Sequence, residues 1–332
     1  MRRREFLKSA GASASAALSA TMGLAAPALA QTLAQAGSWP NKPVKLIVSF
    51  AAGGATDLIA RPWADALSKA FNQQFVVENR GGASGLIGNE AGFRATPDGS
   101  TFLFTGNTGT VLLPLLRPHS FDVRKFVPIA RTGDAINGFV VHPSVGVKTF
   151  AELLDYARKN PGKLNYGSSG AGTSPHLRLE MLKFKTGIDI AHIPYRGGSD
   201  SLQDLLAGNI QMMNEGSTLP HVKAGKLILL NVNFPRRVPE FPDVPTLTEL
   251  GIKDSDVATW FALYGPPGTS SDIVTKLHAT ISEIAATAEM KATMSLVSCV
   301  SVVQSHADLQ KFWETDWAQS EQLIKAANIK LE

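Results

Sequence analysis

The stretch Leu46-Ile47-Val48-Ser49-Phe50-Ala51-Ala52-Gly53-Gly54-Ala55-Thr56-Asp57 runs from an apolar strand through a loop of small residues into a helix. Apolar residues then recur at helical spacing from Ile59 to Phe71. The loop carries no bulky side chain, so a ligand can approach its backbone. The start of the helix offers free N–H groups and a partial positive charge. This unit therefore indicates an α/β fold with a candidate anion site.

The same arrangement occurs a second time. The strand-like stretch Leu164-Asn165-Tyr166 leads into Gly167-Ser168-Ser169-Gly170-Ala171-Gly172-Thr173-Ser174 and then into a helix, and Asn79-Arg80-Gly81-Gly82-Ala83-Ser84-Gly85 is a third small-residue loop. Two domains that present such loops to each other would form a cleft suited to an anion. The alternative is conformational, because glycine permits the positive φ that tight turns need. Asp57 and Ser174 also suit helix caps as well as ligand contacts.

Short apolar strands alternate with amphipathic helices from residue 41 onward, which predicts mainly parallel sheets with helices on both faces. We expect one domain from residues 41–141 and 260–332 and a second from residues 142–259. A capping box of Thr149 and Glu152 begins a helix of the second domain. Further strands are predicted at 75–77, 101–104, 138–143, 227–230 and 257–264, and further helices around 202–206, 273–284 and 306–327.

The composition is that of an ordinary globular protein, with 44% hydrophobic and 18% charged residues among 332. Cys299 is the one cysteine, which excludes an internal disulfide, a cysteine zinc site and an iron–sulfur cluster built from this chain. Its apolar neighbours predict burial. Residues 1–30 hold four basic residues and one acidic residue, so without them the net charge falls from +4 to +1. The pI of about 9.1 therefore gives no support for nucleic-acid binding.

Residues 1–30 show the three parts of an export signal: a basic start, an Ala-rich middle and Ala28-Leu29-Ala30 before Gln31. The run Arg3-Arg4-Glu5-Phe6-Leu7-Lys8 resembles a twin-arginine signal. Arg2 replaces the usual Ser or Thr, so the general secretory route stays open. The middle is too short and too rich in Ser and Gly to span a bilayer. We expect cleavage after Ala30 and a soluble protein in a bacterial periplasm.

Motifs for nucleotide binding and catalysis fail on their spacing. Pro175 stands where a dinucleotide-binding loop would need its third glycine, and no glycine loop ends in Gly-Lys-Ser/Thr. A nucleophile elbow around Ser169 would need glycine at position 171, which is Ala171. His142 and His192 each end an apolar run, which favours structural roles. We therefore expect a protein without a cofactor or metal site that is not an enzyme.

Six stretches, taken in order, resemble the Bug family of periplasmic receptors, the substrate-binding components of tripartite tricarboxylate transporters. The resemblance covers essentially residues 41–332. It departs from the family at Ala52, where proline is usual, and in the third loop, which commonly reads Pro-Gly-Ala-Gly-Gly. The six stretches are Ala52 to Arg61, Val77 to Gly82, Thr96 to Gly99, Tyr166 to Thr173, Ile193 to Gly197 and Asp243 to Thr246.

The resemblance implies a type II periplasmic-binding-protein fold, in which two α/β domains joined by two crossover segments enclose a ligand cleft. It also implies capture of a small organic carboxylate, held largely by backbone amides and ordered water, and its delivery to the membrane permease subunits of the transporter. By position in the family's motifs, the implied ligand contacts are Gly53, Gly54 and Thr56 in the first loop, Ser84 and Gly85 in its neighbour, and Ser168, Ser169, Gly172 and Thr173 in the second-domain loop.

Three side chains outside that set bear on the ligand. Arg196, and after it Arg80, could neutralise a second carboxylate, with a surface salt bridge as the alternative. Asp57 is the acidic residue of the loops that could meet an amino group. If Asp57 is a helix cap, nothing in the loops favours an amino acid, so we expect a carboxylate without an amino group, bound by a monomer. An enzyme exported in its folded state and a ligand sensor for a signalling partner are the alternative functions.

Overall fold

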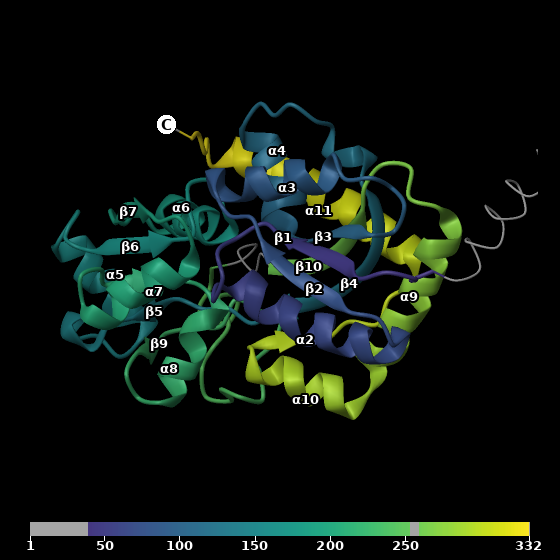
Figure 1. Cartoon of the computed structure of the whole chain (residues 1–332). Coiled ribbons are helices and arrows are strands. Elements are labelled where there is room, and N and C mark those ends of the chain that lie inside the picture. The colour runs from purple at the N-terminus through teal and green to yellow at the C-terminus, as the bar shows by residue number, and fades with distance from the viewer. Residues whose placement is uncertain (1–38, 253–258, 332) are drawn as a thin grey trace, which may run out of the picture. The chain divides into compact units, whose positions relative to one another are not determined.

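The computed structural model describes residues 39–252 and 259–331 (Figure 1). The export signal predicted at residues 1–30 lies outside these residues. Every helix and strand described below belongs to one unit of the chain that begins at Pro43. No helix in the described ranges combines the length and the apolar character that crossing a membrane requires.

The strand β1 (Val44–Val48) lies inside a six-stranded sheet with the order β11-β4-β10-β3-β1-β2. Four of its five side chains are buried, as expected of a strand covered on both faces. We call this sheet and its helices the first lobe. Its other strands are β2 (Phe75–Asn79), β3 (Thr101–Gly106), β4 (Val127–Ala135), β10 (Thr259–Gly265) and β11 (Cys299–Val300).

Helices cover both faces of this sheet. Figure 1 shows α3, α4 and α11 on one side of the strands and α2 and α10 on the opposite side. The helix α2 runs from the first glycine loop, as its apolar spacing predicts, and α11 carries Trp313 into the core beside Trp260 and Tyr264. The helices are α2 (Ala55–Phe71), α3 (Leu86–Phe93), α4 (Leu113–Leu116), α9 (Ser271–Ala286), α10 (Ala288–Leu296) and α11 (His306–Ala326).

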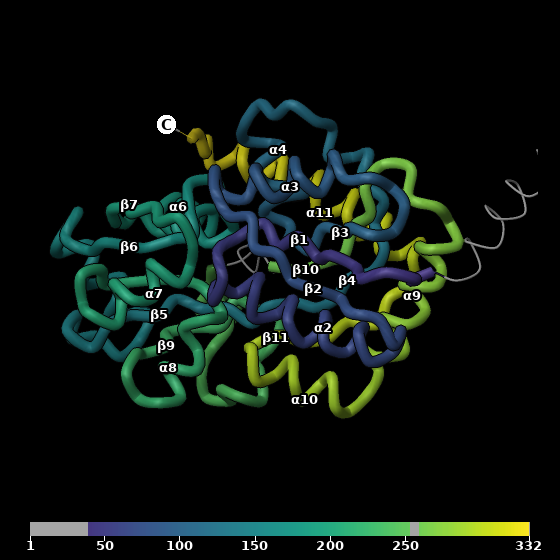
Figure 2. Tube along the Cα trace, viewed as in Figure 1, coloured from purple at the N-terminus to yellow at the C-terminus, as the bar shows by residue number. Residues whose placement is uncertain are grey.

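A second, five-stranded sheet has the order β7-β6-β8-β5-β9, and with its helices we call it the second lobe (Figure 2). The predicted capping box is confirmed at the start of α5, where Thr149 and Glu152 exchange hydrogen bonds. The strands are β5 (Val140–Val141), β6 (Asn165–Ser168), β7 (Ala191–Pro194), β8 (Met212–Met213) and β9 (Ile228–Leu229), and the helices are α5 (Phe150–Lys159), α6 (Ser174–Thr186), α7 (Gly198–Ala207) and α8 (Leu219–Lys223).

Both sheets are mixed, so the prediction of mainly parallel sheets is wrong. In the first lobe β1 runs parallel to β2 and β3, but β10 is antiparallel to both β3 and β4. In the second lobe β6 is parallel to β7 and β8, whereas β5 is antiparallel to β8 and β9. Two of the exceptions, β5 and β10, are the strands that enter from the other lobe, and such a strand needs no crossover helix and can pair in the opposite direction. The third is the edge strand β11, which is antiparallel to β4.

The elements that the sequence analysis missed lack a clear period. The strand β4 is paired on both edges, with β10 and β11, and six of its nine residues are buried, so its side chains show no polar alternation. The helix α10 is short and separated from α9 by the single residue Thr287. Cys299, by contrast, is buried as predicted.

The chain leaves the first lobe between β4 and β5, where it lies against the segment that follows β9. Asn137 O accepts the N–H of Asn233 at 2.7 Å, and Phe139 N–H donates to Asn231 Oδ1 at 3.1 Å. Gly138 lies between these two contacts. The return to the first lobe occurs between β9 and β10. The domain ranges themselves stay a prediction.

Gly138 should tolerate no side chain. A Cβ atom built on it would lie 1.9 Å from the Asn231 carbonyl oxygen and 2.5 Å from Leu229 Cδ1. We therefore expect Gly138→Ala to lower the free energy of unfolding by about 1–3 kcal/mol, the usual cost of overpacking, measured by urea denaturation. Gly54→Ala is the matched control, because there the nearest atom, Ala51 O, is 3.4 Å away. Equal urea midpoints for the two variants would contradict this reading of the crossing.

Candidate functional site

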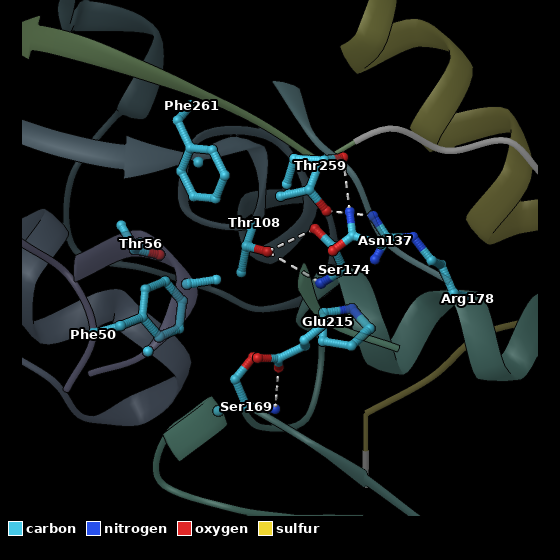
Figure 3. Close-up of a pocket in the computed structure, with 16 residues that line it drawn as sticks. Phe50, Thr56, Thr108, Asn137, Ser169, Ser174, Arg178, Glu215, Thr259 and Phe261 are labelled. Carbon is cyan, nitrogen blue, oxygen red and sulfur yellow. Dashed lines mark hydrogen bonds between the residues drawn. The ribbon is translucent and has the colours of Figure 1, made fainter. Parts of the chain in front are cut away.

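A small cavity lies between the two lobes (Figure 3). The volume of the cavity is about 50 Å³. On the same measure one water molecule needs roughly 10–15 Å³, so the cavity has room for several waters or a small ligand. The first lobe and the crossing contribute Phe50, Gly54, Ala55, Thr56, Gly106, Thr108, Ala135, Asn137, Thr259 and Phe261, and the second lobe contributes Ser169, Ser174, Pro175, Arg178, Gly198 and Glu215.

The first glycine loop brings the start of α2 to the cavity. Gly54 is the N-cap residue, and the first helical residues, Ala55 and Thr56, line the cavity with it. The first N–H groups of a helix have no acceptor within the helix, so this end favours an anion. Phe50 and Phe261 provide apolar wall nearby. The loop therefore delivers a backbone donor site to one end of the cavity, as the strand–loop–helix pattern predicts.

Asp57 holds this loop and does not line the cavity. Its carboxylate accepts the Gly53 N–H at 2.8 Å and hydrogen bonds from Arg61 and Asn79 at 2.9 Å each. Burial acts to raise the pKa of Asp57, but the hydrogen bonds from Arg61, Gly53 and Asn79 hold it below its ordinary value. Asp57 is therefore an ionised group that stabilises the start of α2 without lining the cavity.

The second glycine loop uses its backbone donors inside the protein. Five of its N–H groups donate to protein acceptors, so the loop is held rigidly rather than presented as a row of open amides. The pairs are Ser169 N to Glu215 Oε1 at 3.2 Å, Gly170 N to Ser168 Oγ at 3.1 Å, Gly172 N to His176 Nδ1 at 3.1 Å, Thr173 N to Gly170 O at 3.3 Å and Ser174 N to Thr108 Oγ1 at 3.0 Å.

Polar contacts connect the lobes around the cavity. The hydroxyls of Thr108 and Ser174 lie 2.8 Å apart, and Ser84 Oγ donates to Ala171 O at 2.9 Å. Thr108 begins a π-helical segment, Thr108–Leu112, which follows β3 after the single residue Asn107. The π-helix is a rare conformation that is often found at functional sites. The second and third loops therefore face each other, while the first loop faces the start of α7.

Arg178 and Glu215 are the charged residues among the described residues that line the cavity. Arg178 is 3% exposed and donates through Nη1 to Asn214 Oδ1 at 3.3 Å and through Nη2 to Thr259 Oγ1. Burial lowers the pKa of Arg178 to about 10, although Tyr166 and Glu215 oppose the shift, so the guanidinium stays charged at neutral pH. Burial raises the pKa of Glu215 against the opposing effects of Ser169 and Arg178.

The structure divides the predicted contact residues into two groups, those that line the cavity and those that do not. Gly54, Thr56 and Ser169 line the cavity. The other loop residues, and Arg196, are not among the lining residues. Five of these residues hydrogen-bond within the protein: Gly53 with Asp57, Ser84 with Ala171, Ser168 with His192, Gly172 with His176 and Thr173 with Gly170. Gly85 packs against Phe50, and the open side of Gly172 faces Leu113 and Leu331. Arg196 is exposed, and so is Arg80, which forms an ion pair with Glu78.

The sequence analysis missed Arg178 and Glu215. Arg178 lies in the first half of α6, where the residues on every side of the helix are buried. Because arginine is almost never fully buried without a partner, an arginine among such neighbours predicts a hydrogen-bond or charge partner inside the protein. Glu215 follows β8, a two-residue strand that no periodicity marks. Thr108, Asn137 and Thr259 likewise reach the cavity from elements whose meeting point the sequence does not specify.

Two α/β lobes joined by crossing segments, with a polar cavity lined from both, define the class of two-lobed solute-binding proteins. The family model described as "Tripartite tricarboxylate transporter family receptor" (TctC) matches residues 59–329. The chain therefore belongs to this receptor family, in which the resemblance to the Bug proteins placed it.

Relatives and solved structures agree with this assignment. The UPF0065 protein in the gbd 5' region of Cupriavidus necator is 39% identical over 84% of this chain and 83% of its own length, and Protein BugT of Bordetella pertussis is 33% identical over 80% and 81%. The structure of R. palustris Rpa4515 with adipate has a TM-score of 0.85 at 31% identity, covering 88% of this chain and 99% of that one. That of the periplasmic binding protein BugD has a TM-score of 0.84 at 29% identity, covering 89% and 100%. The type II periplasmic-binding-protein fold is thereby confirmed.

Proposed function

We propose that this receptor captures a small organic carboxylate in the cavity between its lobes and delivers it to the permease subunits of a tripartite tricarboxylate-type transporter. One observation carries the proposal: the cavity joins the start of α2 to the buried Arg178 guanidinium, so two sources of positive potential face one enclosed volume. The related protein Rpa4515, solved with adipate, supports the choice of a carboxylate.

Capture and release would use the contacts that cross between the lobes. Thr108 with Ser174, Ser84 with Ala171 and Arg178 with Thr259 form when the lobes meet over the ligand. Excluding water from the cavity strengthens each hydrogen bond to the ligand. Separation of the lobes at the permease breaks the same contacts and opens the cavity to water.

The place of action that we propose is the periplasm. The leader at residues 1–30 has the features of an export signal with cleavage after Ala30, and the receptor family serves transporters. Mass spectrometry of the protein secreted into the periplasm should show a mature chain that begins at Gln31. A full-length mass, or a protein that stays in the cytoplasm, would contradict this.

Native mass spectrometry of the gently purified mature protein, followed by calorimetry with the molecule released on denaturation, tests the function directly. We expect one small carboxylate per chain that rebinds with measurable heat. A protein that retains no small molecule and gives no heat with a panel of carboxylates would remove the proposed function.

Gly54→Val should abolish ligand binding and leave the fold intact. Gly54 has extended backbone angles that valine adopts readily, and a side chain there would point toward Gly198, which also lines the cavity. Calorimetry with the identified ligand should show at least a roughly 100-fold loss of affinity, since the steric block removes the ligand's place. Gly54→Ala, whose Cβ has ordinary contacts, is the control, and both variants should melt close to the wild type. Full binding by a folded Gly54→Val variant would place the ligand elsewhere.

A further inference from the structure

Asp316 of α11 hydrogen-bonds two residues of the first lobe whose chain neighbours line the cavity. Its Oδ2 accepts the Trp260 Nε1–H at 2.8 Å and the Asn107 Nδ2–H at 3.4 Å. Trp260 is 1% exposed and lies on β10, and the fully buried Asn107 lies between the end of β3 and Thr108. Asp316 therefore joins α11 to two segments that supply walls of the cavity, although it does not line the cavity itself.

The contacts of Asp316 determine the orientation of the Asn107 amide. The indole N–H of Trp260 can only donate, so the Oδ2 atom of Asp316 that it meets acts as an acceptor. The part of the Asn107 amide that meets the same oxygen is therefore its NH2 group. In this orientation Asn107 Oδ1 accepts the hydroxyl of Ser174 at 3.2 Å.

The hydrogen bond from Ser174 crosses between the lobes. Ser174 is the first residue of α6 in the second lobe, and it lines the cavity together with Thr108 of the first lobe. The hydroxyl oxygens of Ser174 and Thr108 lie 2.8 Å apart (Figure 3). Because the single hydroxyl hydrogen of Ser174 is donated to Asn107, the hydrogen between these two oxygens comes from Thr108. Thr108 Oγ1 also accepts the Ser174 N–H at 3.0 Å, so all three bonds join the lobes.

The opposite orientation of the Asn107 amide would break this arrangement. It would place Oδ1 against the Asp316 carboxylate in a buried position, where two acceptors face each other without a hydrogen. It would also present the NH2 group to Ser174, which would then lose the acceptor of its hydroxyl hydrogen. Asp316 excludes that orientation before the lobes meet, and such preorganisation lowers the free-energy cost of closure.

We propose that Asp316 is a positioning residue for closure of the lobes: it holds the Asn107 amide with its oxygen toward Ser174 and so favours the closed form that retains the ligand. The inference rests on the proposed function and goes beyond it, because it assigns a role in binding to a residue outside the cavity. The apparent affinity for a ligand falls in proportion to the fraction of molecules that can close over it.

A double-mutant cycle measured by calorimetry at neutral pH separates this role from packing. D316L removes the acceptor that orients Asn107, and S174A removes the hydroxyl that crosses between the lobes. In the wild-type background we expect D316L to lower the affinity at least about 10-fold, since a hydrogen bond of the closed form is lost. In the S174A background D316L should lower it by less than about 2-fold, because the bond that Asp316 supports is already absent.

The probes are adipate, succinate, citrate and L-aspartate, together with any carboxylate that native mass spectrometry finds on the wild-type protein. S320A is the matched control, because it removes another hydrogen bond to the Asp316 carboxylate from within α11 and leaves Asn107 in place. It should bind like the wild type. D316N keeps an oxygen for Trp260 and Asn107, so its affinity should stay within about 3-fold of the wild type.

The exchange N107D/D316N is a second test that does not depend on the folding of D316L. The new amide at position 316 donates to the new carboxylate at position 107, which accepts the Ser174 hydroxyl as Asn107 does. The exchange should bind within about 3-fold of the wild type, whereas N107D alone sets two carboxylates against each other and should bind at least about 10-fold more weakly. Thermal melting shows which variants are folded.

The outcomes distinguish this inference from the proposed function. If D316L lowers the affinity by the same factor with and without Ser174, or does not lower it, Asp316 acts through packing alone and the inference is overturned. A D316N variant as weak as D316L, or an exchange as weak as N107D, overturns it as well. In each of these cases the wild type still binds and the proposed function stands. If the wild type retains no small molecule and gives no heat with any probe, the proposed function fails and the inference falls with it.

Discussion

Replacing Arg178 with methionine is expected to lower the free energy of unfolding by about 3–5 kcal/mol, the cost of removing one charge from a buried charged cluster. The guanidinium donates to Asn214 and Thr259, and it is the positive charge of the cavity wall that acts on Glu215. Methionine fills much of the same volume but leaves the Asn214 and Thr259 oxygens without this donor and Glu215 without this counter-charge. Urea denaturation at neutral pH measures the loss.

Two further variants separate charge from geometry. Arg178→Lys keeps the positive charge but not the planar fork of donors, so its loss should fall between those of the wild type and the methionine variant. Arg158→Met removes an exposed arginine, paired on the surface with Asp155, and should change the unfolding free energy by no more than about 0.5 kcal/mol. Similar midpoints for Arg178→Met and Arg158→Met would show that the buried guanidinium contributes no more than a surface charge.

The same substitution should weaken ligand binding. Arg178 joins α6 of the second lobe to Thr259 at the start of β10 in the first lobe, so it helps hold the lobes together as well as lining the cavity. A variant that remains folded but binds the ligand as tightly as the wild type would separate the structural role of Arg178 from the proposed carboxylate site.

The parts of the site that could be predicted from the sequence are those that are local in the chain. The turn from β1 into α2 is determined within about a dozen residues, by an apolar strand, two glycines and a helical repeat, so the local sequence predicts a candidate anion site at this loop. The family resemblance then implies Gly54 and Thr56 as contacts, and both line the cavity. The capping box of Thr149 and Glu152 is local for the same reason.

The parts that could not be predicted depend on which distant residues meet. Ser169 was expected to offer its N–H to a ligand, but Glu215, 46 residues further along the chain, accepts that N–H in the structure. Gly172 was expected to contact the ligand, but His176 accepts its N–H and its open side faces Leu113 and Leu331. The glycines of a loop predict which backbone conformations it can adopt. They do not predict which acceptors its N–H groups meet, because those acceptors come from elements that are distant in the sequence.

Two histidines hold the second glycine loop, and the contact of His176 requires its Nδ1 to be unprotonated. His176 Nδ1 accepts the Gly172 N–H at 3.1 Å, and His192 Nε2 lies 2.7 Å from Ser168 Oγ. The two rings stack with their centres 3.9 Å apart. A proton on His176 Nδ1 would point at the Gly172 N–H, and charging both rings at this distance would set two cations against each other.

Acid should therefore destabilise the protein well above the pH at which most carboxylates titrate. Burial lowers the pKa of His176 to about 4, with a further contribution from Lys183, and burial together with the charge of His176 lowers that of His192 to about 4. In the unfolded chain histidine titrates near about 6.5, so between about pH 6.5 and 4 the unfolded state binds more protons. The stabilisation is complete above about pH 6.5 and is lost as the pH falls toward about 4.

Between about pH 7 and pH 5 we expect the free energy of unfolding to fall by about 2 kcal/mol from His176, and by less from His192, which is only partly buried. Glu215, Asp134 and Asp316 oppose this trend, because burial raises the pKa of each and the folded state gains protons there as the pH falls. The wild-type slope alone is therefore a mixture of both effects.

Urea denaturation of His176→Gln and His192→Gln at both ends of this pH interval isolates the histidines, since the carboxyl contributions are common to all three proteins. Glutamine cannot be protonated in this range, so each variant should be less stable than the wild type at neutral pH and lose less stability on acidification. The loop that these rings hold carries Ser169 to the cavity, so ligand affinity in the wild type should decline over the same interval. An unchanged pH slope in both variants would show that neither ring changes its protonation on unfolding, and that the loop owes its shape to backbone contacts alone.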